Sequence, residues 1–257
     1  MILLVGRYNE THDGRAQELE ACLERNLRLD HIEQVHVFFE DDAPPLLCHP
    51  KLKAVQFGRR LQFRDLFDYA NHELGGQLCI IANNDISFDE SLGELVGYDM
   101  EDKLLCLSRW ETQPDGQVVN GNYENSHDAW IFRSPIRSFP CDWYLGLLAS
   151  DTRLAYEARA AGMTLLNPCQ SIRAVHLHLT GVHHYSQHDW VYGPQGLVLP
   201  QSLHEAPKDS TLGYFNRGTH TAHNNVPFFN RFVGGGAQKG QQPAPQVWFS
   251  RQIGKSR

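Results

Sequence analysis

The sequence predicts an α/β fold with a mostly parallel central sheet and helices on both faces. Strand-like and helix-like segments alternate from residue 1 to about residue 100, and this alternation is typical of parallel sheets whose connecting helices cover both faces. The strand-like segments are short apolar runs such as 78–82, Leu-Cys-Ile-Ile-Ala, as expected for strands buried on both sides. Because ligands of such sheets lie at the carboxyl ends of the strands, the polar residues that follow each strand are candidate site residues.

Apolar spacing and turn residues place the individual elements. Strands are expected at 1–5, 35–39, 53–57, 78–82, 103–107, 129–132, 163–166 and 172–177. Helices are expected at 13–29, 61–74 and 151–161. These elements make one domain over residues 1–195. Pro, Gly, Asn, Gln and His dominate residues 196–257, which predicts a loop-rich extension that either closes over an acceptor site or packs on a partner chain.

Composition and charge exclude several classes of protein. The chain of 257 residues is 41% hydrophobic and 21% charged, as in ordinary globular proteins. Its formal net charge of −7 predicts no general attraction to nucleic acid or anionic membranes. No run approaches the ~20 apolar residues that cross a bilayer, the apolar start is short for a signal peptide, and the six cysteines form no CxxC pair. We therefore expect a cytoplasmic protein without a transmembrane segment.

The segment that follows the fourth strand carries oxygen ligands. The apolar run 78–82 leads directly into Asn83-Asn84-Asp85, so amide and carboxylate oxygens lie at the carboxyl edge of the sheet. Mg²⁺ and Mn²⁺ prefer such oxygens and bind beside substrate phosphates. The alternative is a turn that caps the next helix, since Asn and Asp favour that role too.

A carboxylate also stands at the start of the late helix. Asp151 begins the segment 151–161, where the helix dipole and the free N–H groups favour a negative charge. Facing a cleft, such a carboxylate can take a proton from a hydroxyl group. The alternative is a plain N-cap.

Two histidines follow at alternate positions of the last expected strand. His176 and His178 would point to the same face of a strand and share one metal site, which for histidines includes zinc. The alternative is a pair of half-buried histidines bonded to carboxylates or to the backbone.

In this order the segments resemble the GT-A glycosyltransferases, particularly the family 2-like group, over roughly residues 1–190. Arg7-Tyr8-Asn9-Glu10 resembles the turn after the first strand, Asn83-Asn84-Asp85 takes the place of the DxD motif, and Ser150-Asp151 that of the ED motif. Pro168 and then His176 match the group's ending. The chain departs from the group at Asn83, where the motif has Asp, and at Ser150, where it has Glu. The segment 126–133 resembles a signature of uncharacterised bacterial relatives.

The resemblance implies a GT-A fold and the transfer of a hexosyl or related sugar from a nucleotide-diphosphate donor to a saccharide or other hydroxyl acceptor, as in polysaccharide biosynthesis. It implies a Mn²⁺ or Mg²⁺ ion held by Asp85, His176 and His178, with Asp151 as the base of an inverting reaction. The implied donor-binding residues are Arg7, Tyr8, Asn9, Glu10, Arg60, Asn83 and Asn84. The implied acceptor-side residues are Asp128 and Trp130.

Three other functions and the oligomeric state stay open at this point. A nucleotidyltransferase would share the α/β core and the metal, but the first loop lacks the Gly-rich, basic turn that cradles a triphosphate. A metal-dependent hydrolase would use the histidines and need no acceptor. A non-catalytic sugar-binding protein would use the aromatic loops alone. A homo-oligomer is compatible with each.

Overall fold

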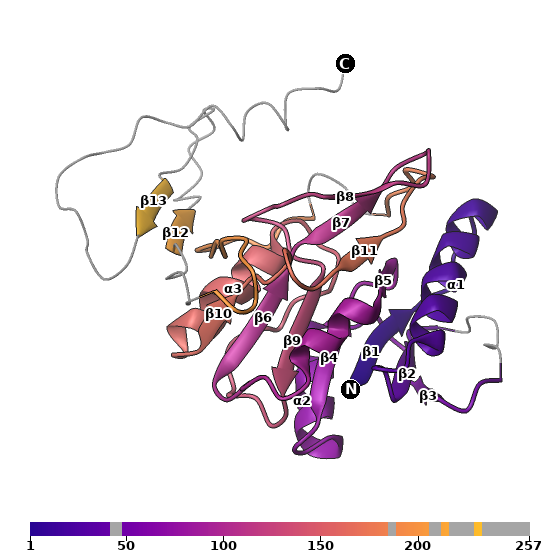
Figure 1. Ribbon diagram of the computed structural model, residues 1–257, viewed down its shortest axis with the longest axis horizontal. Coiled ribbons are helices and arrows are strands. Elements are labelled where there is room, and N and C mark those ends of the chain that lie inside the picture. The colour runs from indigo at the N-terminus through magenta and orange to yellow at the C-terminus, as the bar shows by residue number, and fades with distance from the viewer. Residues whose placement is uncertain (42–47, 185–188, 206–211, 216–228, 233–257) are drawn as a thin grey trace.

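The computed structural model describes residues 1–41, 48–184, 189–205, 212–215 and 229–232, and within them the chain forms a large sheet, a smaller sheet and a separate pair of strands (Figure 1). The large sheet has seven strands in the order β10-β6-β9-β4-β1-β2-β3. Its strands, in chain order, are β1 (Ile2–Arg7), β2 (Gln34–Phe39), β3 (Leu52–Gln56), β4 (Leu78–Ala82), β6 (Lys103–Leu107), β9 (Ala129–Arg133) and β10 (Thr164–Leu166). Each lies within a few residues of a strand expected from the sequence.

The direction of β9 makes the large sheet mixed. β9 is antiparallel to both of its neighbours, β4 and β6, whereas the pairings β1–β2, β1–β4, β2–β3 and β6–β10 are parallel. Four of the six pairings are parallel, so the sheet is mostly parallel, as expected, with β9 as the exception. β9 is an apolar run like its neighbours, and such a run is compatible with either direction.

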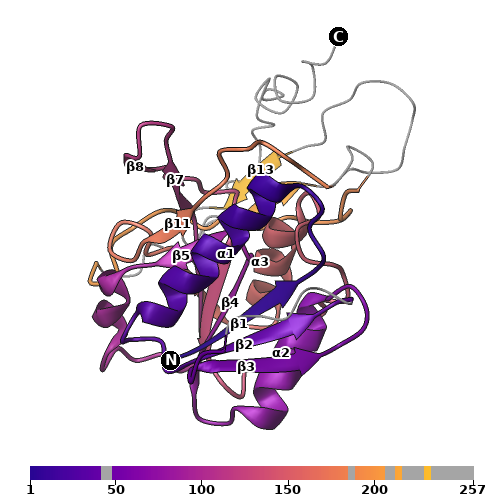
Figure 2. The ribbon, with the colours of Figure 1, turned by 90° about the vertical axis from the view of Figure 1, so that its right-hand side faces the viewer.

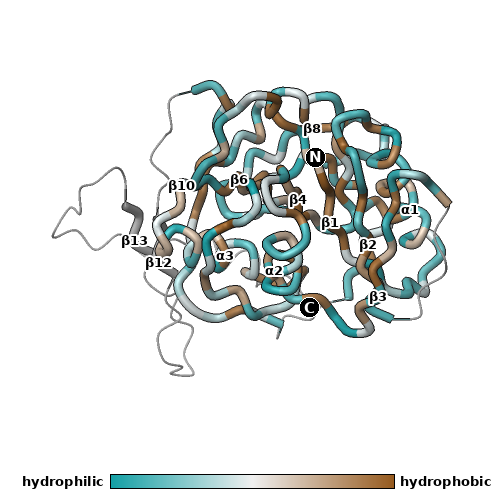
Figure 3. The backbone as a smooth tube through the Cα atoms, turned by 90° about the horizontal axis from the view of Figure 1, so that it is seen from below, coloured by the Kyte–Doolittle hydropathy of each residue, from teal (hydrophilic) through white to brown (hydrophobic). Residues whose placement is uncertain are grey.

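Helices cover both faces of the large sheet (Figure 2). On one face α1 (Asp13–Arg28) packs its Leu23 and Leu27 into a core with Leu3 and Val5 of β1. On the other face α2 (Phe63–Glu73) and α3 (Ser150–Ala160) share a core with the alternate residues of β1, which include Leu4. Strand side chains alternate between faces, so a strand that is apolar at successive positions, such as β4, contributes to both cores. Figure 3 shows hydrophobic colouring along β1 and β4.

The smaller sheet begins where β4 and β6 end (Figure 1). Its strand order is β5-β11-β7-β8. The strands are β5 (Ile86–Phe88), β7 (Arg109–Thr112), β8 (Val118–Asn120) and β11 (Ala174–His176). Of these only β11 was expected, and it is shorter than the predicted 172–177. β5, β7 and β8 have three or four residues each, too few for a periodic pattern. The 3-10 helix η1 (Glu90–Leu95) follows β5.

Little of the C-terminal extension is described. An antiparallel pair, β12 (Leu212–Phe215) and β13 (Phe229–Phe232), lies in the segment expected to be loop-rich. The predicted lid or oligomer contact of residues 196–257 falls largely outside the described residues. Among the described helices none is both long and apolar enough to cross a membrane.

Candidate functional site

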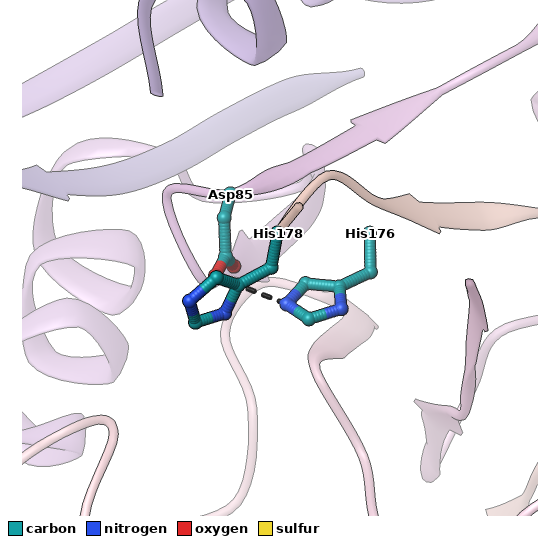
Figure 4. Close-up of side chains that lie close together, drawn as sticks. All are labelled: Asp85, His176 and His178. Carbon is teal, nitrogen blue, oxygen red and sulfur yellow. Dashed lines mark hydrogen bonds and ion pairs between the residues drawn. The ribbon is translucent and has the colours of Figure 1, made fainter. Parts of the chain in front are cut away.

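Three predicted metal ligands lie together where the two sheets meet (Figure 4). One ligand atom from each of Asp85, His176 and His178 falls within 4.8 Å of the others. Asp85 lies in the turn between β4 and β5, and His176 ends β11. Antiparallel pairing sets His176 opposite Ile86, which places its Nε2 3.2 Å from Asp85 Oδ2. The pairing of β5 with β11 thus joins residues that are far apart in the sequence.

His178 reaches the cluster differently from the prediction. It lies beyond the end of β11 rather than on the same face of a strand. Its ring centroid is 5.4 Å from that of His176, nearly perpendicular to it, and its Nε2 lies 2.9 Å from the carbonyl oxygen of Val182. The rings of His176 and His178 come together because the chain changes course after β11, and not because both residues lie on one strand.

The chemistry of the cluster fits a divalent cation. Asp85 is 8% exposed, and its Oδ1 is buried without a hydrogen-bond partner among the described residues. A buried polar atom usually has a partner, and a carboxylate oxygen beside two imidazoles is a donor set for Mn²⁺ or Zn²⁺ more than for Mg²⁺, which prefers oxygen alone.

A buried arginine, missed by the sequence analysis, completes this cluster. Arg15 of α1 pairs with Asp85 Oδ2, with Glu18 at 3.0 Å and with the carbonyl oxygen of Leu177 at 3.1 Å. Glu18 accepts the backbone N–H of Thr180 at 2.8 Å, so the Arg15–Glu18 pair links α1 to the segment that follows His178. The sequence held a signal for this pair, because the spacing of Arg15, Glu18 and Cys22 places the two charged residues on the buried, apolar face of the helix.

Ionisation of the cluster follows from these contacts. Burial by itself would raise the pKa of Asp85, but the hydrogen bond and charge of His176 and the charge of Arg15 outweigh it and hold that pKa below its ordinary value. Burial opposes the charged form of His176, yet the carboxylates of Asp85 and Glu111 raise its pKa to about 9. The cluster is therefore an ion-paired network when no metal is bound.

The network continues through Glu111 and Arg109 to Asp128. Glu111 Oε2 lies 2.8 Å from His176 Nδ1, and its Oε1 accepts from Arg109 Nε at 2.6 Å. Arg109 Nη1 donates to Asp128 Oδ2 at 3.0 Å. Asn83 Nδ2 donates to Asp128 Oδ1 at 2.9 Å. The predicted acceptor-side residue Asp128 and the predicted donor-side residue Asn83 are thus bonded to each other.

Asp151 lies in the first turn of α3, as predicted. Its Oδ2 accepts the backbone N–H of His127 at 2.8 Å. Desolvation, with the negative charge of Asp128, raises the pKa of Asp151 to about 6 against the hydrogen bond from His127. The sequence analysis missed His127, which is 2% exposed; burial lowers its pKa to about 3.

Most predicted donor-binding residues line one pocket at the carboxyl end of β1. Arg7, Tyr8, Asn9, Glu10 and Asn84 are among its lining residues. Glu10 lies 2.6 Å from His184 Nε2. Burial and the nearby charge of Glu10 raise the pKa of Tyr8 to about 12, so its hydroxyl stays protonated well above neutral pH.

Four predicted binding residues are not among the lining residues of this pocket: Asn83 and Asp128, described above, and Arg60 and Trp130. The guanidinium of Arg60 lies over the ring of Tyr144 at 5.0 Å and donates to the carbonyl oxygen of Leu145 at 3.1 Å. Trp130 is 1% exposed, with its ring 4.8 Å from that of Phe63. The prediction that Trp130 contacts an acceptor is wrong, because β9 directs this side chain into the core beneath α2.

The chain has a structural likeness among solved proteins. No family model matches the sequence, and no curated protein matches it. Among solved structures, the chain is similar to the mannosyltransferase PcManGT from Pyrobaculum calidifontis, solved in complex with GDP-Man and Mn²⁺, with a TM-score of 0.46 and 16% sequence identity. The match covers 68% of this chain and 55% of that one.

Proposed function

We propose that the protein is a metal-dependent glycosyltransferase that moves a sugar from a nucleotide-diphosphate donor to an acceptor hydroxyl. The observation that carries the proposal is the turn after β4. Asn84 of this turn lines the pocket at the end of β1, and the next residue, Asp85, belongs to the metal-ligand cluster. A donor whose nucleotide lies in the pocket therefore has its diphosphate beside the candidate cation.

The metal would be held by Asp85, His176 and His178. The oxygen and nitrogen donors favour Mn²⁺ over Mg²⁺. When bound there, the ion supplies positive charge to the diphosphate leaving group. Arg15, already paired with Asp85, adds a second positive charge at the same edge of the sheet.

Asp151 is the proposed base. Its pKa of about 6 leaves it ionised at neutral pH yet basic enough to take a proton from an acceptor hydroxyl, which is the range that favours general base catalysis. Attack by that hydroxyl on the anomeric carbon, opposite the departing diphosphate, inverts the configuration. Burial keeps the pKa of Asp151 raised, and the negative charge of Asp128 adds to this effect.

The first experiment is thermal stabilisation of the protein by a panel of nucleoside diphosphates, with and without Mn²⁺. A ligand of the native state raises its stability by mass action, and we expect one nucleotide to act only with Mn²⁺. Asp85→Asn should abolish this metal dependence. Stabilisation by Zn²⁺ alone, with no response to any nucleotide, would instead indicate a hydrolase.

The second experiment is turnover with the sugar form of that nucleotide and a panel of hydroxyl acceptors. Asp151→Asn should abolish transfer and leave donor binding nearly intact, whereas Asp142→Asn, a surface aspartate paired with Arg64, should do neither. A fully active Asp151→Asn protein would remove Asp151 from its role. Pyrophosphate release from a nucleoside triphosphate and a sugar phosphate would establish a nucleotidyltransferase in place of the proposed enzyme.

A further inference from the structure

Both ring nitrogens of His176 are held by carboxylates. Nε2 lies 3.2 Å from Asp85 Oδ2, and Nδ1 lies 2.8 Å from Glu111 Oε2. The His176 side chain is 12% exposed, so water has little access to either contact. A histidine that binds a metal through one nitrogen usually donates its other N–H to a carboxylate or a carbonyl, which fixes the plane of the ring and its tautomer.

Glu111 is itself fixed in place. Parallel pairing of β7 with β11 sets Glu111 opposite His176. Its two oxygens are divided, with Oε2 toward His176 and Oε1 toward Arg109 Nε at 2.6 Å. Arg109 in turn donates to Ser126 Oγ at 3.1 Å and to Asp128 at 3.0 Å. The Glu111 carboxylate is thus fixed by the pairing of its strand with β11 and by Arg109, and its hydrogen bond to Nδ1 sets the orientation of the His176 ring.

Within the part of the chain that the structure describes, His178, the other histidine of the cluster, makes no hydrogen bond with a carboxylate. Its Nε2 lies 2.9 Å from the carbonyl oxygen of Val182, which belongs to the turn after β11 and not to a strand of the sheet. Of the two imidazoles, only that of His176 is therefore held by a carboxylate on a paired strand, Glu111 of β7.

We propose that Glu111 is a positioning residue for the candidate metal centre: it holds His176 Nδ1 so that Nε2 faces Asp85, and Arg109 holds Glu111. The inference rests on the proposed function only in that the cluster of Asp85 and the two histidines binds a divalent cation. It requires no particular donor, acceptor or reaction.

Calorimetric titration of the full chain with Mn²⁺ tests the proposal. Glu111→Ala should weaken Mn²⁺ binding about 10–100-fold, the usual effect of losing such a partner. Glu111→Gln keeps an oxygen that can accept from Nδ1 and should weaken it less. The matched control is Glu94→Gln, because Glu94 lies 2.6 Å from His204 Nε2 in an exposed carboxylate–histidine pair; this variant should bind like the parent protein.

A spectroscopic measurement separates positioning from general damage to the fold. Co²⁺ in the site gives visible absorption that reports its ligands, and we expect the band to change in Glu111→Ala and Glu111→Gln but not in Glu94→Gln. If both Glu111 variants bind Mn²⁺ and Co²⁺ like the parent while His176→Ala does not, Glu111 has no positioning role and the metal centre stands. If the parent protein binds neither ion, the metal centre and this inference both fail.

Discussion

The raised pKa of Asp151 predicts that wild-type stability falls with pH in a way that Asp151→Asn removes. Desolvation moves this pKa from the ordinary 3.8 to about 6 in the folded protein. Between these two values the folded state keeps the proton and the unfolded state has released it. Because stability falls with rising pH wherever the folded state binds more protons, the contribution of Asp151 is full below about pH 3.8 and is lost as pH rises toward 6.

The size of the effect follows from the same two pKa values. Each unit of difference corresponds to about 1.4 kcal/mol, so ionising Asp151 costs about 3 kcal/mol of folding free energy in total. About 2 kcal/mol of this falls between pH ~4.5 and ~7.5, most of it below pH ~6, since half of the unfolded chains have already released the proton by about pH 3.8.

The assay is urea unfolding of the wild type and of Asp151→Asn at several pH values in that range. The difference in unfolding free energy, wild type minus variant, should fall by about 2 kcal/mol with rising pH. Asp142→Asn is the control, because the hydrogen bond from Arg64 lowers the pKa of Asp142 and its contribution is lost only as pH falls below the ordinary value. A flat difference for Asp151→Asn would refute the raised pKa and with it the argument that this carboxylate is a competent base.

Three further predictions concern burial and ion pairing. Trp130→Ala should lower the unfolding free energy by about 3–5 kcal/mol, measured with urea, because the ring is 1% exposed in the core. Asp85→Asn should cost about 3 kcal/mol in the same assay without metal, because it removes one of the two carboxylates paired with the buried Arg15, which keeps Glu18; an unchanged midpoint would mean that the pair with Asp85 is not formed. Glu18→Ala should speed hydrogen exchange at the amide of Thr180, which donates to Glu18 at 2.8 Å, and equal exchange rates would contradict that contact.

Much of the large sheet could be predicted because most of its strands are apolar and longer than three residues. The run Leu78–Ala82 and the face of α1 with Leu23 and Leu27 are local patterns that specify burial without reference to the rest of the chain. Apart from β11, the strands of the smaller sheet could not be found in this way. β5 has three residues, and it pairs with β11, which lies far along the chain.

The residues of the candidate site likewise fall into those that local sequence patterns predict and those that only the fold brings together. Asp85 and His176 could be predicted from the sequence. Asp85 follows an apolar strand, where ligands of α/β sheets bind, and His176 is a histidine, a common metal ligand. Glu111 and Arg109 carry no such signal, since a charged residue on a short strand is ordinarily a solvated one. Their role appears only when β7 lies beside β11.

The sequence by itself determined the elements of the large sheet, the helices on its two faces and the residue types at the carboxyl ends of its strands, because apolar periodicity and turn chemistry act over a few neighbouring residues. Tertiary structure alone decided that β9 runs antiparallel, that Trp130 lies in the core, and that Arg15 and Glu111 join Asp85 and His176 in one ion-paired network. Those outcomes depend on strand direction and on contacts between residues distant in the chain, which no local pattern encodes.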